Sequence, residues 1–157
     1  MMKNLKYIAI AALGLVACEP EFDNSVEDAG FYSTGEADLS NFVAIGNSLT
    51  AGYADGALYV QGQENSFPNI LANKFALAGS GQEFTQPLMN DNLGGLTLGG
   101  TQIAQNRFVL SAATPGSGDF GLTVLDGTPT TEVSNVLTGP FSNMGVPGAK
   151  SFHLLAN

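Results

Sequence analysis

The chain has only one cysteine, one histidine and five basic residues among its 157 residues. A single cysteine excludes an internal disulfide and a zinc site built from several cysteines. With one histidine as well, a metal centre made from the protein's own side chains has few ligands to draw on, so we expect none. The five basic residues face 14 acidic ones, for a net charge of −9. That balance disfavours nucleic acid as a partner, because phosphates would be repelled.

The composition is otherwise that of a folded domain with many turns. Hydrophobic residues make up 44% of the chain, which is enough for a core, and the length is typical of one domain. Twenty glycines and seven prolines indicate long loops.

The first 17 residues have the pattern of a signal peptide. Lys3 and Lys6 precede an apolar run, Tyr7–Ala17, that is too short to span a bilayer as a helix. The run ends in Leu-Val-Ala followed by Cys18, which resembles a bacterial lipobox. That resemblance implies that Cys18 becomes the lipidated first residue of the mature protein. We therefore expect attachment to the membrane in the bacterial cell envelope, at the outer membrane or cell surface. An ordinary secretory signal with an incidental cysteine is the alternative.

Residues 18–38 form an acidic segment. Seven acidic residues lie within positions 19–38, where apolar periodicity is weak. We interpret the segment as a solvated tether between the lipid and the domain. The acidic residues also resemble surface-export signals of some bacteria, although a plain linker explains them as well.

The folded domain is expected over residues 39–157. Its first element is an apolar run, residues 42–45, which Gly46 stops, as in a buried strand of a parallel sheet. A helix is predicted after Ser66, with Pro68 in its first turn and Gly79 following its last residue. The apolar positions of that helix fall on one face: Phe67, Ile70, Leu71, Phe75 and Ala78.

Residues 79–140 differ from the segments around them. They are rich in glycine, proline, threonine and asparagine, and they show no fixed-period repeat. We interpret them as a loop-rich insertion in which "RFVLSAA" and "FGLTVLDG" are hairpin strands. A glycine- and proline-rich turn then leads to a helix-like tail at 149–155.

Ser48 is the candidate reactive residue. It follows the predicted strand directly, at the carboxyl edge where α/β sheets place their sites. A serine there has its own backbone N–H near a helix start, where developing negative charge is favoured. The nucleophile elbow G-x-S-x-G would need glycine at Thr50, and a P-loop would need Gly-Lys-Ser/Thr at 51–53, so both motifs fail.

The motif that fits is that of the SGNH, or GDSL-like, hydrolases. The stretch "GNSLTAGYADG…SFPNILANKFA" resembles the first block of that family, and "NMGVPGAKS" resembles its second block. The resemblance covers residues 42–78 and 143–151. It implies a flavodoxin-like three-layer α/β/α fold, no cofactor, and hydrolysis of acyl or acetyl esters of small molecules, glycans or lipids.

The resemblance also assigns roles to individual residues. Ser48 matches the catalytic serine, whose backbone N–H is one donor of the oxyanion hole. Gly148 matches the glycine whose N–H is another donor, and Gly145 and Pro147 shape its turn.

Two departures from the family pattern matter. Position 47 is asparagine where the family has aspartate, which keeps an acceptor oxygen but removes the charge. The Gly-x-Asn-Asp and Asp-x-x-His blocks are absent, and His153 has Lys150 three residues before it. We therefore expect the chain to be the N-terminal part of such a hydrolase, with an incomplete sheet and little activity of its own.

Simpler interpretations stay open for several of these residues. Ser48 can be a helix cap, Gly148 a glycine at a helix start, and His153 a partly exposed helix residue. Asp55 and Asp126 are expected to form turns. The three aromatic residues after the serine fit either an acyl pocket or the core: Tyr53, Tyr59 and Phe67.

Two other functions remain as alternatives to the hydrolase. One is a non-catalytic surface lipoprotein that binds glycans or lipids. The other is a structural protein of the cell envelope built on the Gly/Thr-rich middle of the chain.

Overall fold

The structure is a computed structural model that describes residues 31–112 and 118–155. The chain divides into two units, residues 1–33 and 34–157, and every element below lies in the second unit. The predicted signal peptide 1–17, Cys18 and the tether up to residue 30 lie outside the described residues.

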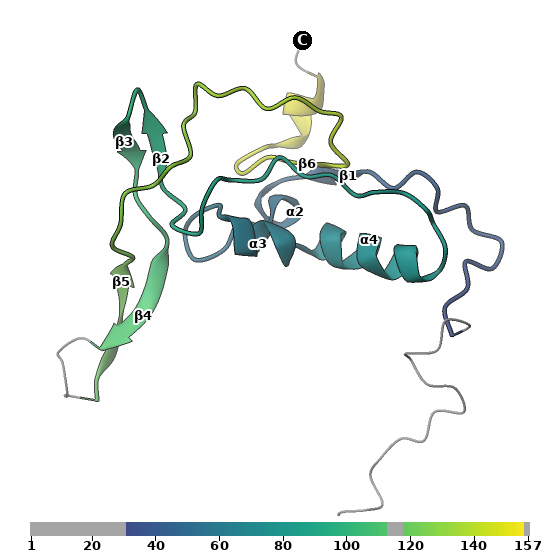
Figure 1. Ribbon diagram of the computed structural model, residues 1–157, viewed down its shortest axis with the longest axis horizontal. Helices are drawn as coiled ribbons and strands as arrows, with labels where there is room; N and C mark the ends of the chain where they lie inside the picture. The colour runs from purple at the N-terminus through teal and green to yellow at the C-terminus, as the bar shows by residue number, and fades with distance from the viewer. Residues whose placement is uncertain (1–30, 113–117, 156–157) are drawn as a thin grey trace, which may run out of the picture. The chain divides into compact units, whose positions relative to one another are not determined.

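Short elements make up this second unit (Figure 1). The helices are α2 (Ser48–Ala51), α3 (Val60–Glu64), α4 (Phe67–Leu77) and the 3-10 helix η2 (Ser151–Leu155). The strands are β1 (Ala44–Gly46), β2 (Leu96–Leu98), β3 (Thr101–Ala104), β4 (Phe108–Ala112), β5 (Phe120–Val124) and β6 (Asn143–Gly145). Within the described residues the strands pair as β1–β6, β2–β3 and β4–β5. The predicted mixed α/β class is confirmed, while these two-stranded sheets show no three-layer arrangement.

The β1–β6 sheet is parallel, as the apolar run before Gly46 predicts. Its register pairs Ala44 with Asn143 and Gly46 with Gly145. Only Ala44 of β1 is buried, whereas Ile45 is 61% exposed. The expectation of a strand buried on both faces is therefore wrong: α2 packs against this sheet, but the Ile45 side chain stays largely exposed.

Helix α4 begins and ends where the sequence predicts. Ser66 is its N-cap residue, although its hydroxyl contacts Gln86 rather than the helix amides. Gly79 follows the C-cap with a φ of 90°, as a C′ glycine does. The predicted apolar face is largely exposed, and the buried residues of α4 are Pro68 and Ala72.

The middle of the chain forms two antiparallel hairpins, β2–β3 and β4–β5 (Figure 1). The strands β4 and β5 lie within the two segments that the sequence predicted as hairpin strands, so this prediction is confirmed. The rest of residues 79–140 is mostly without regular structure in the part described.

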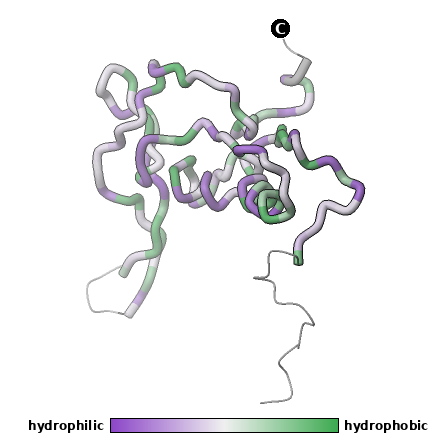
Figure 2. Tube along the Cα trace, turned by 45° about the vertical axis from the view of Figure 1, so that its right-hand side comes forward, coloured by the Kyte–Doolittle hydropathy of each residue, from purple (hydrophilic) through white to green (hydrophobic). Residues whose placement is uncertain are grey.

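Buried apolar residues are few and mostly small among the described residues. They are Ala44, Ala51, Ala57, Tyr59, Pro68, Ala72 and Pro129. Hydrophobic residues, green in Figure 2, are spread along many segments instead of gathering in one place. The small core lies around α2, β1 and the starts of α3 and α4, next to Ser48.

Candidate functional site

Ser48 is the first residue of α2 and lies two residues after the end of β1. Its side chain is half-buried. The N-cap Asn47 accepts a long hydrogen bond of 3.4 Å from the Leu49 amide through Oδ1, so the amide side chain does the capping that an aspartate would do. A Cβ at Gly46 would lie 2.1 Å from Thr50 Oγ1, which explains the glycine before the turn.

The second segment of the site is β6 and the turn after it. The pairing of Gly46 with Gly145 continues one residue further, because the Val146 amide donates to the Gly46 carbonyl at 3.0 Å. A Cβ at Gly145 would lie 2.3 Å from the backbone nitrogen of Ala51. Glycine at 145 therefore allows β6 to approach the helix that begins with Ser48.

The Asn143 side chain links β6 to α2 through hydrogen bonds. This side chain is 3% exposed. Nδ2 donates to the Thr50 carbonyl at 2.8 Å and to Gln86 Oε1 at 2.9 Å, and Oδ1 accepts from the Gly145 amide at 3.0 Å. No role was predicted for Asn143 from the sequence. The signal is the Asn-x-Gly spacing of its motif, which allows the asparagine side chain to accept from the amide two residues ahead.

Gly148 lies in a tight turn directly after this sheet edge. The Ala149 amide donates to the Val146 carbonyl at 3.0 Å, so Pro147 and Gly148 are the central residues. Gly148 has a φ of 80°, which a type II turn requires at its third residue and which glycine adopts at no steric cost. The prediction that Pro147 shapes this turn is confirmed, whereas a helix-start role for Gly148 is not, since η2 begins at Ser151.

The backbone N–H groups of Ser48 and Gly148 are both available as donors. Among the described residues, neither amide donates a hydrogen bond. A hollow of about 170 Å³ lies between the end of β1 and the segment after β6, lined by Ile45, Gly46, Asn47, Ala149, Lys150 and Ser151. This edge of the β1–β6 sheet thus carries the Ser48 hydroxyl and the unpaired amides of Ser48 and Gly148, with the hollow next to them.

His153 does not serve as a base for Ser48 in this arrangement. Its Nδ1 accepts a hydrogen bond from the Lys150 amide at 3.1 Å, and its ring lies against Phe152 with centroids 4.3 Å apart. The amide occupies the lone pair that a neutral imidazole would use to take a proton. Within the described part of the chain, no side chain is hydrogen-bonded to the Ser48 hydroxyl.

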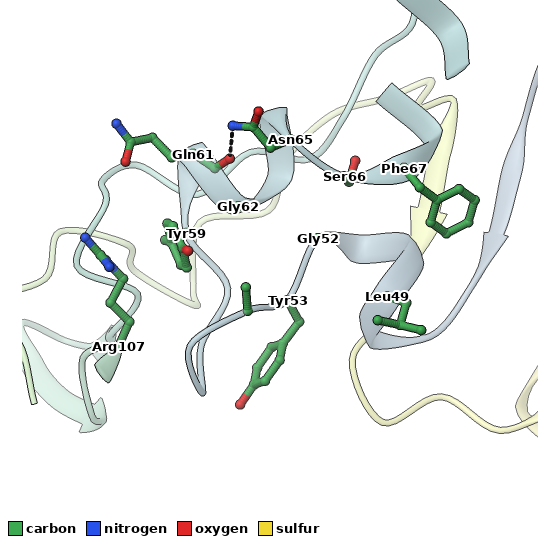
Figure 3. A pocket seen from close by; sticks show the side chains of 11 residues that line it. Leu49, Gly52, Tyr53, Tyr59, Gln61, Gly62, Asn65, Ser66, Phe67 and Arg107 are labelled. Carbon is green, nitrogen blue, oxygen red and sulfur yellow. Dashed lines mark hydrogen bonds between the residues drawn. The ribbon is translucent and has the colours of Figure 1, made fainter. Parts of the chain in front are cut away.

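A larger pocket of about 550 Å³ begins at Leu49, next to the serine (Figure 3). Tyr53, Tyr59 and Phe67 all line it. Tyr59 is buried, while Tyr53 and Phe67 are exposed, so the core interpretation holds for Tyr59 only.

Asp55 forms an ion pair with Arg107, which lines this pocket. Arg107 Nη1 lies 3.6 Å from Asp55 Oδ2, and its guanidinium lies 4.8 Å from the Tyr59 ring centroid. The Tyr59 hydroxyl donates to Asp55 at 2.6 Å. This hydrogen bond, with burial and the negative charge of Asp55, raises the pKa of Tyr59. Asp55 also has a φ of 53°, which fits the predicted turn.

Comparison with known proteins adds no family assignment. No protein-family model matches the chain, and neither a curated protein nor a solved structure matches it.

The described residues hold no group of three or more His, Cys, Asp or Glu side chains placed to bind a metal ion. They also include no helix of the length and apolar character needed to cross a bilayer.

Proposed function

We propose that the chain is a serine ester hydrolase of the SGNH type, with Ser48 as its nucleophile. The observation that carries the proposal is the parallel register of β1 and β6. Because Gly46 pairs with Gly145, Ser48 and Gly148 follow the carboxyl ends of two neighbouring strands and belong to one edge of the sheet. The three-layer α/β/α sandwich of that family remains a prediction.

The reaction would begin with attack of Ser48 Oγ on an ester carbonyl. The carbonyl oxygen becomes an oxyanion, which the amides of Ser48 and Gly148 stabilise by about 3 kcal/mol each. The alcohol leaves, the acyl group stays on Oγ, and water then releases it as an acid. The hollow lined by Asn47 and Ala149, the chain neighbours of Ser48 and Gly148, would take part of the ester.

The proton of the serine hydroxyl has no acceptor among the described side chains. Without an oriented base, Ser48 keeps the pKa of an ordinary alcohol and reacts slowly. Release of the acyl group needs the same base to activate water, so we expect an acylated Ser48 to persist after one slow turnover.

The experiment is to incubate the chain with p-nitrophenyl acetate and to map acetylation by peptide mass spectrometry. We expect an acetyl group on Ser48, and Ser48→Ala to remove both this label and the accompanying release of p-nitrophenol. Gly148→Ala should slow acetylation about tenfold, because alanine disfavours the φ of 80° and displaces the amide.

Gly79→Ala is the matched control for that variant. Gly79 also has a positive φ and open space where a Cβ would be, but it lies at the end of α4. Gly79→Ala should therefore leave the rate of Ser48 acetylation unchanged. Equal rates of p-nitrophenol release by the parent and by Ser48→Ala would refute the hydrolase.

We also propose that the chain is a lipoprotein of the bacterial cell envelope, held at the membrane through a lipidated Cys18. The basic and apolar leader and the lipobox-like residues before Cys18 support this, and they lie outside the described residues. Its ester substrate would then be an envelope or extracellular molecule.

A further inference from the structure

The pocket that begins at Leu49 combines aromatic faces with polar groups. Its volume of about 550 Å³ is in the range of small-molecule sites. In Figure 3, Tyr59 and Arg107 lie at one end, Leu49 and Phe67 lie at the other, and the Tyr53 ring lies between them. Tyr53 and Phe67 are 39% and 51% exposed, so both rings offer area to a ligand.

The charged groups of the pocket cancel one another. Arg107 is paired with Asp55, and its Nε donates to the Asn92 carbonyl at 2.8 Å. Among the described residues, no hydrogen bond occupies Nη2 of the guanidinium, so it remains a donor. An anionic ligand would meet Asp55 beside Arg107 and a chain of net charge −9. The pocket therefore suits a ligand without charge.

Two amide side chains supply further polar groups along the wall. Asn65 donates through Nδ2 to the Gln61 carbonyl at 2.8 Å, which holds the side chain in place and leaves Oδ1 as an acceptor. The Gln61 side chain is exposed and has no hydrogen bond within the described residues, so it offers both a donor and an acceptor. A purely apolar ligand, such as a fatty acyl chain, would make no hydrogen bonds with these groups.

We infer that this pocket binds a sugar unit of a neutral glycan. The apolar C–H face of a sugar ring packs on the negative face of an aromatic ring, here Tyr53 or Phe67. Its hydroxyls, which both donate and accept, match Gln61, Asn65 and the open nitrogen of Arg107. The inference goes beyond ester hydrolysis, because no residue named here takes part in the reaction at Ser48.

Binding is to be measured by NMR titration of the full chain with cellobiose, maltose, lactose and chitobiose, each to about 20 mM, which detects millimolar affinities. We expect at least one of these neutral disaccharides to bind. Phe67→Ala and Gln61→Ala should each weaken that binding about fivefold, as loss of one ring or one amide contact does. Leu77→Ala, an exposed position of α4 outside the pocket, should leave it unchanged.

Three results would overturn the inference. They are no binding of any of the four disaccharides, equal binding in the parent, Phe67→Ala and Gln61→Ala, and tighter binding of octanoate or glucuronate than of the neutral sugars. The titration is repeated with Ser48→Ala, which should bind sugar as the parent does. Failure of sugar binding would thus refute this inference alone, and failure of Ser48 acetylation would refute the hydrolase alone.

Discussion

Asn143 organises the candidate site through three hydrogen bonds from one buried side chain. Two of them reach across to Thr50 and Gln86, and the third shapes its own strand at Gly145. A buried amide of this kind stabilises a structure only when its partners are in place, because an unpaired one costs about 1–3 kcal/mol. The hydroxyl of Ser48, by contrast, makes no hydrogen bond to any described residue, as a nucleophile that awaits its base would.

Asp91 is a partly buried charged group that is likewise stabilised by its hydrogen-bond partners. Burial opposes its ionisation, but hydrogen bonds from the Thr130 hydroxyl and amide and from the Leu93 and Gly94 amides outweigh burial and lower its pKa below the usual 3.8. The Thr130 hydroxyl lies 2.7 Å from Oδ2, and the Leu93 amide lies 2.8 Å from Oδ1. The ionised form therefore ties residues 91–94 to residue 130.

Asp91→Asn should lower the free energy of unfolding by about 1 kcal/mol at neutral pH, after allowance for solvent screening. Because the folded pKa is depressed, this stabilisation is present above pH 3.8 and disappears as the pH falls through the lower folded value. Urea unfolding of parent and variant at pH 7, 5, 4 and 3 measures it. If the difference in free energy of unfolding between parent and variant stays the same at all four pH values, the assignment is contradicted.

At the scale of elements, β1, β6 and α2 depend on close backbone approach. A Cβ at Gly145 would lie 2.3 Å from Ala51 N and 2.6 Å from Thr50 C. Both atoms belong to the backbone, so no side chain can rotate away to make room.

Gly145→Ala should therefore destabilise the fold by about 3 kcal/mol and slow acetylation of Ser48, because β6 must move away from α2. Gly121→Ala in β5 is the control, since nothing lies within 4 Å of the added Cβ and its φ is not positive. Urea unfolding midpoints compare the two variants. Similar midpoints for both would show that α2 and β6 are not in contact.

At the scale of the whole folded unit, much apolar surface is exposed. On one face of the β4–β5 hairpin, Leu110 pairs with Leu122, and these side chains are 69% and 74% exposed. Across the β1–β6 sheet, Met144 beside Ile45 is 49% exposed. Exposed apolar patches of this kind bind hydrophobic dyes and promote association.

We expect the chain to enhance the fluorescence of anilinonaphthalene sulfonate and to associate as its concentration rises. The double variant Leu110→Thr and Leu122→Thr should reduce both effects without loss of stability, because these side chains bury little and threonine favours strands. Ser111→Thr, on the opposite face of the same strand, should change neither. Dye titration and sedimentation test this, and undiminished fluorescence in the double variant would refute it.

Local patterns in the sequence were enough for some elements. The stop at Gly46, the helix between Ser66 and Gly79, and the two strands of the β4–β5 hairpin follow from turn residues, caps and apolar runs, which act on near neighbours in the chain. The position of Ser48 at the end of a strand follows from the same local signals.

The packing partners of those elements depend on contacts between segments far apart in the sequence. Strand β6 has three residues, Asn143–Gly145, with no apolar pattern of their own, so its pairing with β1 depends on contacts about a hundred residues apart. The role of Asn143, the ion pair of Asp55 with Arg107 and the exposure of the predicted apolar face of α4 are likewise long-range outcomes. The physical reason is that caps and turns are fixed by neighbours in sequence, whereas register, burial and side-chain partners are fixed by neighbours in space.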